Sequence, residues 1–214
     1  MKSSFYGLII VLSIFACISL AAPEPAVVQG PGLWTINIAF THPQPIVLRQ
    51  ASDNKPVRFW YMIITLTNNT GQDVVFYPKC DLVTDTFQIT PAGKGVGSLV
   101  FDRIKERYKN NYPFLEYLGN IDNKILQGKD NAKDIAIIWQ DFDHEAKNIS
   151  IFITGLSNET VEVKYPVKND EGQEKGQDKI YLKKTLEIKY KVKGNLASPS
   201  GATLEYISKS WIMR

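Results

Sequence analysis

Apolar and polar residues alternate with a period of two along most of this chain. Residues 34–40 show the alternation, and residues 180–192 show it most cleanly. On one face of the second segment lie Ile180, Leu182, Leu186, Ile188, Tyr190 and Val192. Such alternation is typical of strands that bury one side of a sheet. The pattern therefore predicts a chain built mainly from half-buried strands.

Two segments are apolar on both faces and predict central strands. Residues 58–67 read RFWYMIITLT, and residues 135–139 read IAIIW. Aromatic and β-branched side chains of this kind suit a strand that is covered on both sides. We therefore expect Trp60 and Trp139 to be core residues.

Turn residues separate these segments from further strands. Residues 68–71 (NNTG) predict a turn, with residues 74–77 returning as the hairpin partner of the strand at 58–67. The polar, glycine-containing segment 168–179 is the strongest candidate for a mobile loop. Further strands are predicted at 82–83, 87–89, 148–154, 160–165 and 204–213.

One segment has a helical period instead. Val100, Ile104 and Tyr108 fall four residues apart among charged positions, which predicts one short helix near 99–110. About nine short strands with turn signals between them and a single helix favour one architecture. We predict an all-β fold, an antiparallel immunoglobulin-like β-sandwich with one helical insertion.

The N-terminus has the pattern of a secretory signal. Lys2 precedes an apolar run at 7–16, and small residues follow before Pro23. The run is shorter than the roughly 20 residues that span a bilayer. We predict a signal peptide at 1–22, cleaved after Ala21 or Ala22, so that the mature protein is exported to the periplasm or the exterior, without a membrane span.

The remainder divides into a linker and a domain. Residues 23–32 are rich in Pro and Gly and predict an extended linker, and residues 33–214 predict one β-sandwich domain. Ile14–Cys17 loosely resembles a bacterial lipobox, in which Cys17 would carry a lipid anchor. The bulky Phe15 favours cleavage at Ala21 or Ala22 over that anchor.

Composition narrows the classes of partner. The chain is 44% hydrophobic and 22% charged, as expected for a folded globular protein, and its formal net charge is +3. That charge is too small to indicate a nucleic-acid partner. After removal of the signal only Cys80 remains, so the exported protein is expected to depend on its core and not on an internal disulfide.

Six blocks of the sequence carry a resemblance. They are FWYMIITLTNNTGQDVVFYP (59–78), DLVTDT (81–86), ILQGKDNAKDIAIIW (125–139), ITGLSNET (153–160), LKKTLEIKY (182–190) and WIMR (211–214). In this order they resemble an uncharacterised family of exported bacterial β-sandwich proteins of unknown function. The resemblance implies export and the fold, and it implies no activity and no catalytic residue. The run from the aromatic strand into TNNTG is also similar to immunoglobulin-like extracellular domains, at the level of the fold.

The densest group of ligand-type side chains lies at 141–145. Asp141, Asp143, His144 and Glu145 are the candidates for a metal site, since carboxylates suit Ca²⁺ and a histidine suits a transition metal. No EF-hand spacing follows, and the sequence favours a charged turn between two strands. The same carboxylates support the alternative hypothesis of a hydrolase acting on extracellular carbohydrate.

Other catalytic patterns are missing from the sequence. His42 and His144 are the only histidines, which excludes a three-histidine zinc site, and no GxSxG, HExxH, P-loop or GxGxxG motif occurs. No catalytic residue and no cofactor is therefore predicted.

The single cysteine after the signal is expected to be structural. Lys79 and Asp81 shift the pKa of Cys80 in opposite directions, and we expect a half-buried structural thiol.

Four aromatic residues form the candidate binding surface. Tyr108, Tyr112, Phe114 and Tyr117 follow one another through the helix and the segment after it, and such rings suit protein contacts and sugar platforms. The favoured alternative is that they cap an open end of the sandwich. The sequence thus predicts an exported non-enzymatic binding or assembly module of the cell envelope, with an envelope protein or a polysaccharide as partner.

Overall fold

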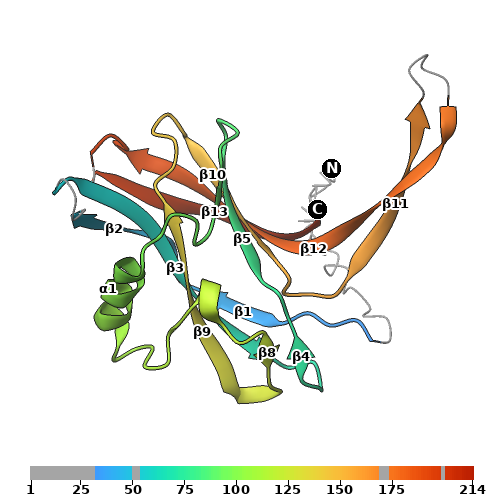
Figure 1. Cartoon of the computed structure of the whole chain (residues 1–214), viewed down its shortest axis with the longest axis horizontal. Coiled ribbons are helices and arrows are strands. Elements are labelled where there is room, and N and C mark those ends of the chain that lie inside the picture. The colour runs from blue at the N-terminus through green and yellow to red at the C-terminus, as the bar shows by residue number, and fades with distance from the viewer. Residues whose placement is uncertain (1–31, 50–53, 169–173, 199–200) are drawn as a thin grey trace, which may run out of the picture.

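The computed structural model describes residues 32–49, 54–168, 174–198 and 201–214. The predicted signal peptide, nearly all of the predicted linker and Cys17 lie outside these residues. The described part is mostly β-strand, with one α-helix, and the predicted all-β antiparallel sandwich is confirmed (Figure 1). Within the described residues no helix has both the length and the apolarity to cross a membrane.

One sheet is built around the long strand β3 (Pro56–Asn68). β9 (Gly128–Gln140) pairs with one edge of β3, while β2 (Gln44–Arg49) and β1 (Asn37–Phe40) pair in succession with the other. A two-residue strand, β7 (Glu116–Tyr117), adds a parallel pair to β9. These five strands form the first sheet of the sandwich.

The second sheet is built around β12 (Glu174–Gly194). β10 (Asn148–Thr154) and β13 (Ala202–Met213) pair with its second half, and β11 (Thr160–Lys168) pairs with its first half. The sheet continues from β10 to β5 (Lys79–Thr84) and β6 (Ile89–Pro91). A separate pair joins β4 (Val74–Val75) to β8 (Lys124–Ile125).

The main core lies between the two sheets. Trp60 and Trp139 are fully buried there, as predicted, and they face side chains of β10 and β12. The opposite face of the first sheet is covered by α1 (Ser98–Tyr108) and by residues 109–117 that follow it. This second cover explains why β3 and β9 are apolar on both faces. The next element, η1 (Leu118–Asn120), packs through Leu118 against the main core.

The single helix is where the spacing predicts it. Val100 and Ile104 are its buried residues, and they pack against Tyr61 and Ile63 of β3. The charged positions between them stay exposed. The four-residue period therefore marks the face that contacts the first sheet.

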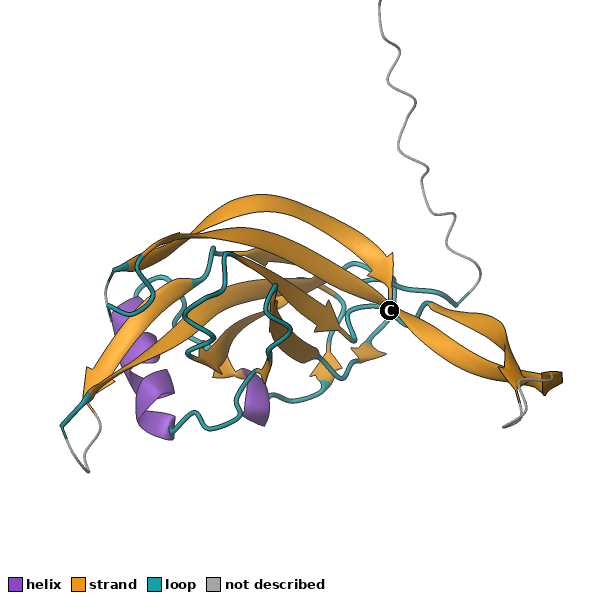
Figure 2. Ribbon diagram, turned by 90° about the horizontal axis from the view of Figure 1, so that it is seen from above, coloured by secondary structure: helices purple, strands orange, loops and turns teal. Residues whose placement is uncertain are grey.

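The segment that was predicted to be a mobile loop belongs largely to a strand. Residues 174–179 are the start of β12 and pair with β11. Together, residues 160–168 and 174–183 form a two-stranded hairpin arm that projects from the body of the sandwich (Figures 1 and 2). For residues 168 and 174–179 the prediction was wrong, because polar composition does not prevent the pairing of strands in an exposed hairpin. Residues 169–173 lie outside the described residues.

The predicted hairpin between residues 58–67 and 74–77 is also wrong. β4 pairs with β8 and not with β3. The side-chain nitrogen Nδ2 of the buried Asn68 donates to the carbonyls of Gln72 (2.8 Å) and Ile125 (2.9 Å). These bonds hold the turn against β8 and direct the chain toward that strand. Short strands such as β4, β7 and β8 also raise the described total to thirteen strands, above the predicted nine.

The predicted C-terminal strand is present, but one of its apolar residues faces outward. Lys189 pairs with Ser208 and Tyr190 pairs with Tyr206, so Ile207 is an extra residue in a β-bulge. Ile207 is 51% exposed, whereas Trp211 packs against the main core. Ile207, Trp211 and Met213 occupy alternating positions of the sequence, a pattern that predicts one buried face for all three.

Candidate binding groove

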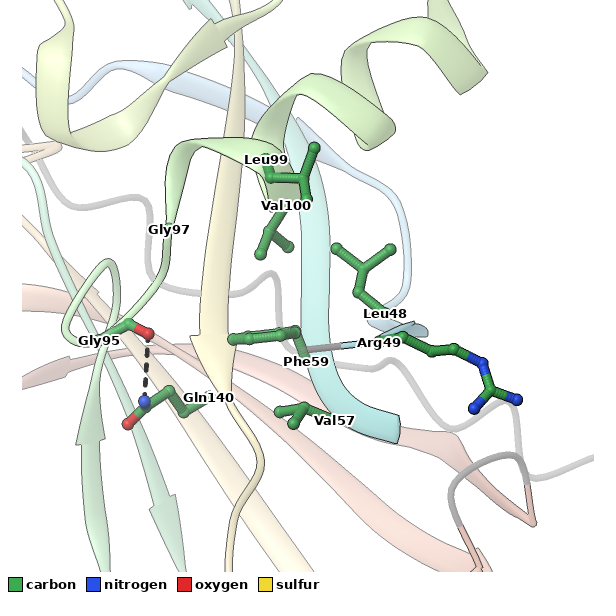
Figure 3. A pocket seen from close by; sticks show the side chains of 9 residues that line it. All are labelled: Leu48, Arg49, Val57, Phe59, Gly95, Gly97, Leu99, Val100 and Gln140. Atoms are coloured by element: carbon green, nitrogen blue, oxygen red, sulfur yellow. Dashed lines mark hydrogen bonds between the residues drawn. The ribbon is translucent and has the colours of Figure 1, made fainter. Parts of the chain in front are cut away.

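A groove opens on the outer side of the first sheet, where β2 and β3 meet the start of α1. Its volume is about 380 Å³. Leu48, Val57, Phe59, Leu99 and Val100 supply most of its lining, as Figure 3 shows. A concave, largely apolar surface of this size is the usual form of a binding site.

A glycine-rich turn forms one wall of the groove. The amide of Gly93 donates to the carbonyl of Ile138 (2.8 Å), and the side-chain amide of Gln140 donates to the carbonyl of Gly95 (3.1 Å). Gly95 has a φ of 69°, in the left-handed region, and a Cβ there would meet the side-chain amide of Gln140. The positive φ of Gly95 therefore favours glycine at this point of the turn.

The rim of the groove is electropositive. Arg49 lies at its edge, with Nη1 donating to the carbonyl of Asn54 (3.2 Å). α1 begins beside it with Gly97 as N-cap, without a side-chain cap bond and without an acidic residue in the first turn. The amide of Val100 donates to the carbonyl of Gly97 (3.1 Å), and the amides of Ser98 and Leu99 at the start of the helix add partial positive charge to that of Arg49.

This lining suits binding rather than covalent chemistry. The nine residues that form it include one cation and one amide, and they include no Ser, Cys, His, Asp or Glu. Aliphatic and aromatic side chains would receive an apolar group, and the positive rim would favour an acidic group beside it.

The predicted cluster at 141–145 has a different role in the structure. Asp141 forms a bidentate ion pair with the buried Arg58, with Nε–Oδ1 at 2.9 Å and Nη2–Oδ2 at 2.8 Å. The indole of Trp60 also donates to Oδ1 of Asp141 (2.9 Å). Both carboxylate oxygens are thus engaged, and Asp141 anchors the ends of β3 and β9.

The neighbouring residues form a hydrogen-bonded turn. Oδ1 of Asp143 accepts from the amide of Glu145 (3.0 Å), and Nε2 of His144 lies 3.1 Å from Oδ2 of Asp141. A hydrogen bond from the side chain of Thr86, and then the bond from the amide of Glu145, lower the pKa of Asp143. The described residues contain no group of three or more His, Cys, Asp or Glu side chains that could hold a metal ion. This geometry favours the charged turn over a metal site or a carboxylate pair.

The remaining histidine and the cysteine are part of the packing. Nδ1 of His42 lies 3.3 Å from the hydroxyl of Tyr190, and its ring contacts that of Tyr206. Cys80 is fully buried, not half-buried as predicted. Burial, followed by the charge of Asp81, raises the pKa of the Cys80 thiol, which leaves it unreactive.

Three of the four candidate aromatic residues cover the outer face of the first sheet. Tyr108, Tyr112 and Tyr117 pack against the cluster around Tyr61, so they cap a face of the sheet and not an open end of the sandwich. Phe114 is 84% exposed and does not join them.

Hydrogen bonds around the hydroxyl of Tyr61 hold α1 against the outer face of the first sheet. The hydroxyl of Tyr61 lies 3.2 Å from that of Tyr108 and 3.3 Å from Oε1 of Gln44, and it accepts from Nη1 of Arg107 (3.0 Å). Burial is the main cause that raises the pKa of Tyr61 to about 12.

The sequence alone did not indicate the groove. Its walls come from β2, which was not predicted, and from residues 93–97, which lie in no predicted strand or helix. The pattern Gly-x-Gly-x-Gly immediately before a helix was the available signal, since such a turn lets backbone and helix approach closely.

Comparison of the chain with protein-family models, with curated proteins and with solved structures finds no match in any of the three. The resemblance to an exported bacterial family therefore stays a prediction.

Proposed function

We propose that this protein is an exported, non-enzymatic binding module of the cell envelope, and that its groove holds an apolar side chain of a protein partner beside an acidic residue. The observation that carries the proposal is the composition of the groove: an aliphatic and aromatic lining with Arg49 and the uncapped start of α1 at its rim. The N-terminal signal pattern supports the location.

A protein partner suits this lining better than a polysaccharide. Sugar sites combine exposed aromatic faces with many hydrogen-bonding side chains. In this groove Phe59 is the one aromatic residue of the lining, and Gln140 already donates to Gly95. An apolar side chain next to a carboxylate would use both the lining and the rim.

Site-specific crosslinking in the native envelope tests the proposal. A photo-reactive side chain at Leu99, which is 54% exposed at the groove, is expected to capture a defined partner band. The same group at Ile89, which is 56% exposed on β6, is the matched control and is expected to capture none. Arg49→Glu is expected to abolish capture at Leu99. Equal capture at the two positions, or capture that is indifferent to Arg49→Glu, would contradict the proposal.

A further inference from the structure

The hairpin arm carries an exposed apolar strip. Cross-strand pairing places Val161 opposite Leu182 and Val163 opposite Ile180 on one face of the arm. Tyr165 follows on the same face and pairs with Asp178. We call Val161, Val163, Tyr165, Ile180 and Leu182 the arm strip. Its members other than Leu182 are 36–44% exposed.

Among the described residues, no second layer covers the strip, although it continues an inner face of the sandwich. Ile180 and Leu182 lie on the same side of β12 as Leu186 and Ile188, which are buried against the first sheet. The first sheet does not extend beneath the arm (Figures 1 and 2). A two-stranded hairpin gains little stability alone, and contiguous exposed apolar residues mark interaction surfaces.

The strip ends in a carboxylate. The hydroxyl of Tyr165 donates to Oδ2 of Asp178 (3.1 Å), and the amide of Lys179 donates to its Oδ1 (2.8 Å). Asp178 is thereby held beside the apolar side chains. The arm therefore presents an apolar surface next to an acidic group, which complements the apolar lining and the positive rim of the groove.

The two surfaces lie at opposite ends of the molecule. The groove lies beside α1 and β2, while the arm projects from the far side of the body (Figures 1 and 2). An arm therefore cannot reach the groove of its own chain, but it can reach the groove of a second copy.

We propose that the arm of one copy docks into the groove of the next, so that the protein assembles head to tail. Val163 and Ile180 enter the apolar lining, and Asp178 faces Arg49. This inference rests on the proposed function and names the partner as a second copy. Because the contact joins two different surfaces, it generates open chains or rings and not a closed two-fold dimer.

Docking of arm against arm fits the observations less well. Each strip offers only five partly exposed side chains. It would also bring two copies of the carboxylate Asp178 onto one small contact and leave Arg49 unused. Insertion into the groove pairs the opposite charges of Asp178 and Arg49.

Two interface variants test the inference on the purified protein. Ile180→Glu disables the arm, and Leu99→Glu combined with Arg49→Glu disables the groove. All three residues are exposed, so the variants are expected to keep the melting temperature of the wild type. Ile89→Glu is the matched control. Sedimentation velocity is expected to show a concentration-dependent series beyond the dimer for the wild type and the control, and monomers for each interface variant.

Mixing the two variants is the decisive step. The Ile180→Glu variant keeps an intact groove and the groove variant keeps an intact arm, so the mixture is expected to form a 1:1 dimer and nothing larger.

A charge swap tests the contact between Asp178 and Arg49. Asp178→Arg and Arg49→Asp are each expected to weaken association about tenfold or more, and their combination in one chain is expected to restore it.

Three outcomes would overturn the inference: a wild type that stays monomeric at all concentrations, a groove variant that still dimerises alone, or a mixture that stays monomeric. If crosslinking at Leu99 captures a different envelope protein while the wild type stays monomeric, the proposed function stands and self-assembly through the arm is excluded.

Discussion

Trp60 and Trp139 lie directly opposite each other on β3 and β9, and both are fully buried, yet their indoles differ in hydrogen bonding. Nε1 of Trp60 donates to Oδ1 of Asp141 at 2.9 Å. Nε1 of Trp139 has no hydrogen-bond partner among the described residues. One fully buried aromatic pair therefore contains one satisfied donor and one unsatisfied donor.

Replacement of each tryptophan by phenylalanine separates packing from hydrogen bonding. Both changes shrink a buried ring, but only Trp60→Phe removes a hydrogen bond to a carboxylate. We expect Trp60→Phe to lower the free energy of unfolding by about 1.5–3 kcal/mol more than Trp139→Phe. Replacement of either residue by alanine should cost ~3–5 kcal/mol. Urea unfolding of the variants measures these differences, and equal losses for the two phenylalanine variants would contradict the assignment.

Because Asp141 pairs with the buried Arg58, we expect its replacement to lower the free energy of unfolding far more than replacement of a neighbour in the segment 141–145. Asp141→Ala leaves the guanidinium of Arg58 buried without its counter-ion, although the carbonyls of Leu196 and Ser198 still accept from it. We expect a loss of about 3–5 kcal/mol in the free energy of unfolding. Glu145→Ala, at an exposed position of the same turn, should change it by less than about 0.5 kcal/mol. Similar losses at both positions in chemical denaturation would show that Asp141 is not the anchor.

The contrast between these two features shows how far sequence patterns reach. The burial of Trp60 and Trp139 follows from apolar runs that are continuous in the chain, so it was predictable. The pair of Arg58 and Asp141 joins residues 83 positions apart. The local composition around Asp141 suggested a charged turn, a metal site or a carboxylate pair, and it did not point to Arg58. The groove likewise combines three distant segments, and no local pattern encodes that meeting.

Irregular strand geometry limited the prediction of the sheets. The alternation along β12 predicted its buried face correctly for Leu186, Ile188 and Tyr190. The same alternation failed at Ile207, because the bulge there moves every residue before it to the opposite face. It also could not show that Ile180 lies in the arm, beyond the cover of the first sheet.

The buried thiol of Cys80 predicts resistance to thiol reagents and a specific pH dependence. Burial raises its pKa in the folded state, while the thiol of an unfolded chain has a pKa of about 8.5. Below that pH both states hold the proton. Above it the unfolded state loses the proton first, so stability falls as pH rises, by up to about 1.4 kcal/mol per pH unit.

Cys80→Ala isolates this contribution. Between about pH 8.5 and 10 the variant should show a flatter decline in the free energy of unfolding than the wild type. Buried tyrosines such as Tyr61, with its pKa raised to about 12, contribute only above about pH 10, where unfolded tyrosine ionises. Parallel pH profiles for the two proteins, or rapid labelling of Cys80 in the native state, would contradict full burial.

The C-terminal strand is expected to be indispensable to the fold. β13 pairs with β12 from Lys184 to Gly194, and Trp211 packs against the core with Nζ of Lys184 5.6 Å from its ring centroid. Deletion of residues 204–214 would expose that core and leave the edge of β12 unpaired, which favours aggregation. We expect the truncated protein to lose its cooperative melting transition. Trp211→Ala should cost about 2–3 kcal/mol, because the ring is only partly buried, and Ile207→Ser at the exposed bulge should cost less than about 0.5 kcal/mol. An unchanged transition after truncation would mean that β13 is an appendage of the sandwich and that β12 is stable as an edge strand.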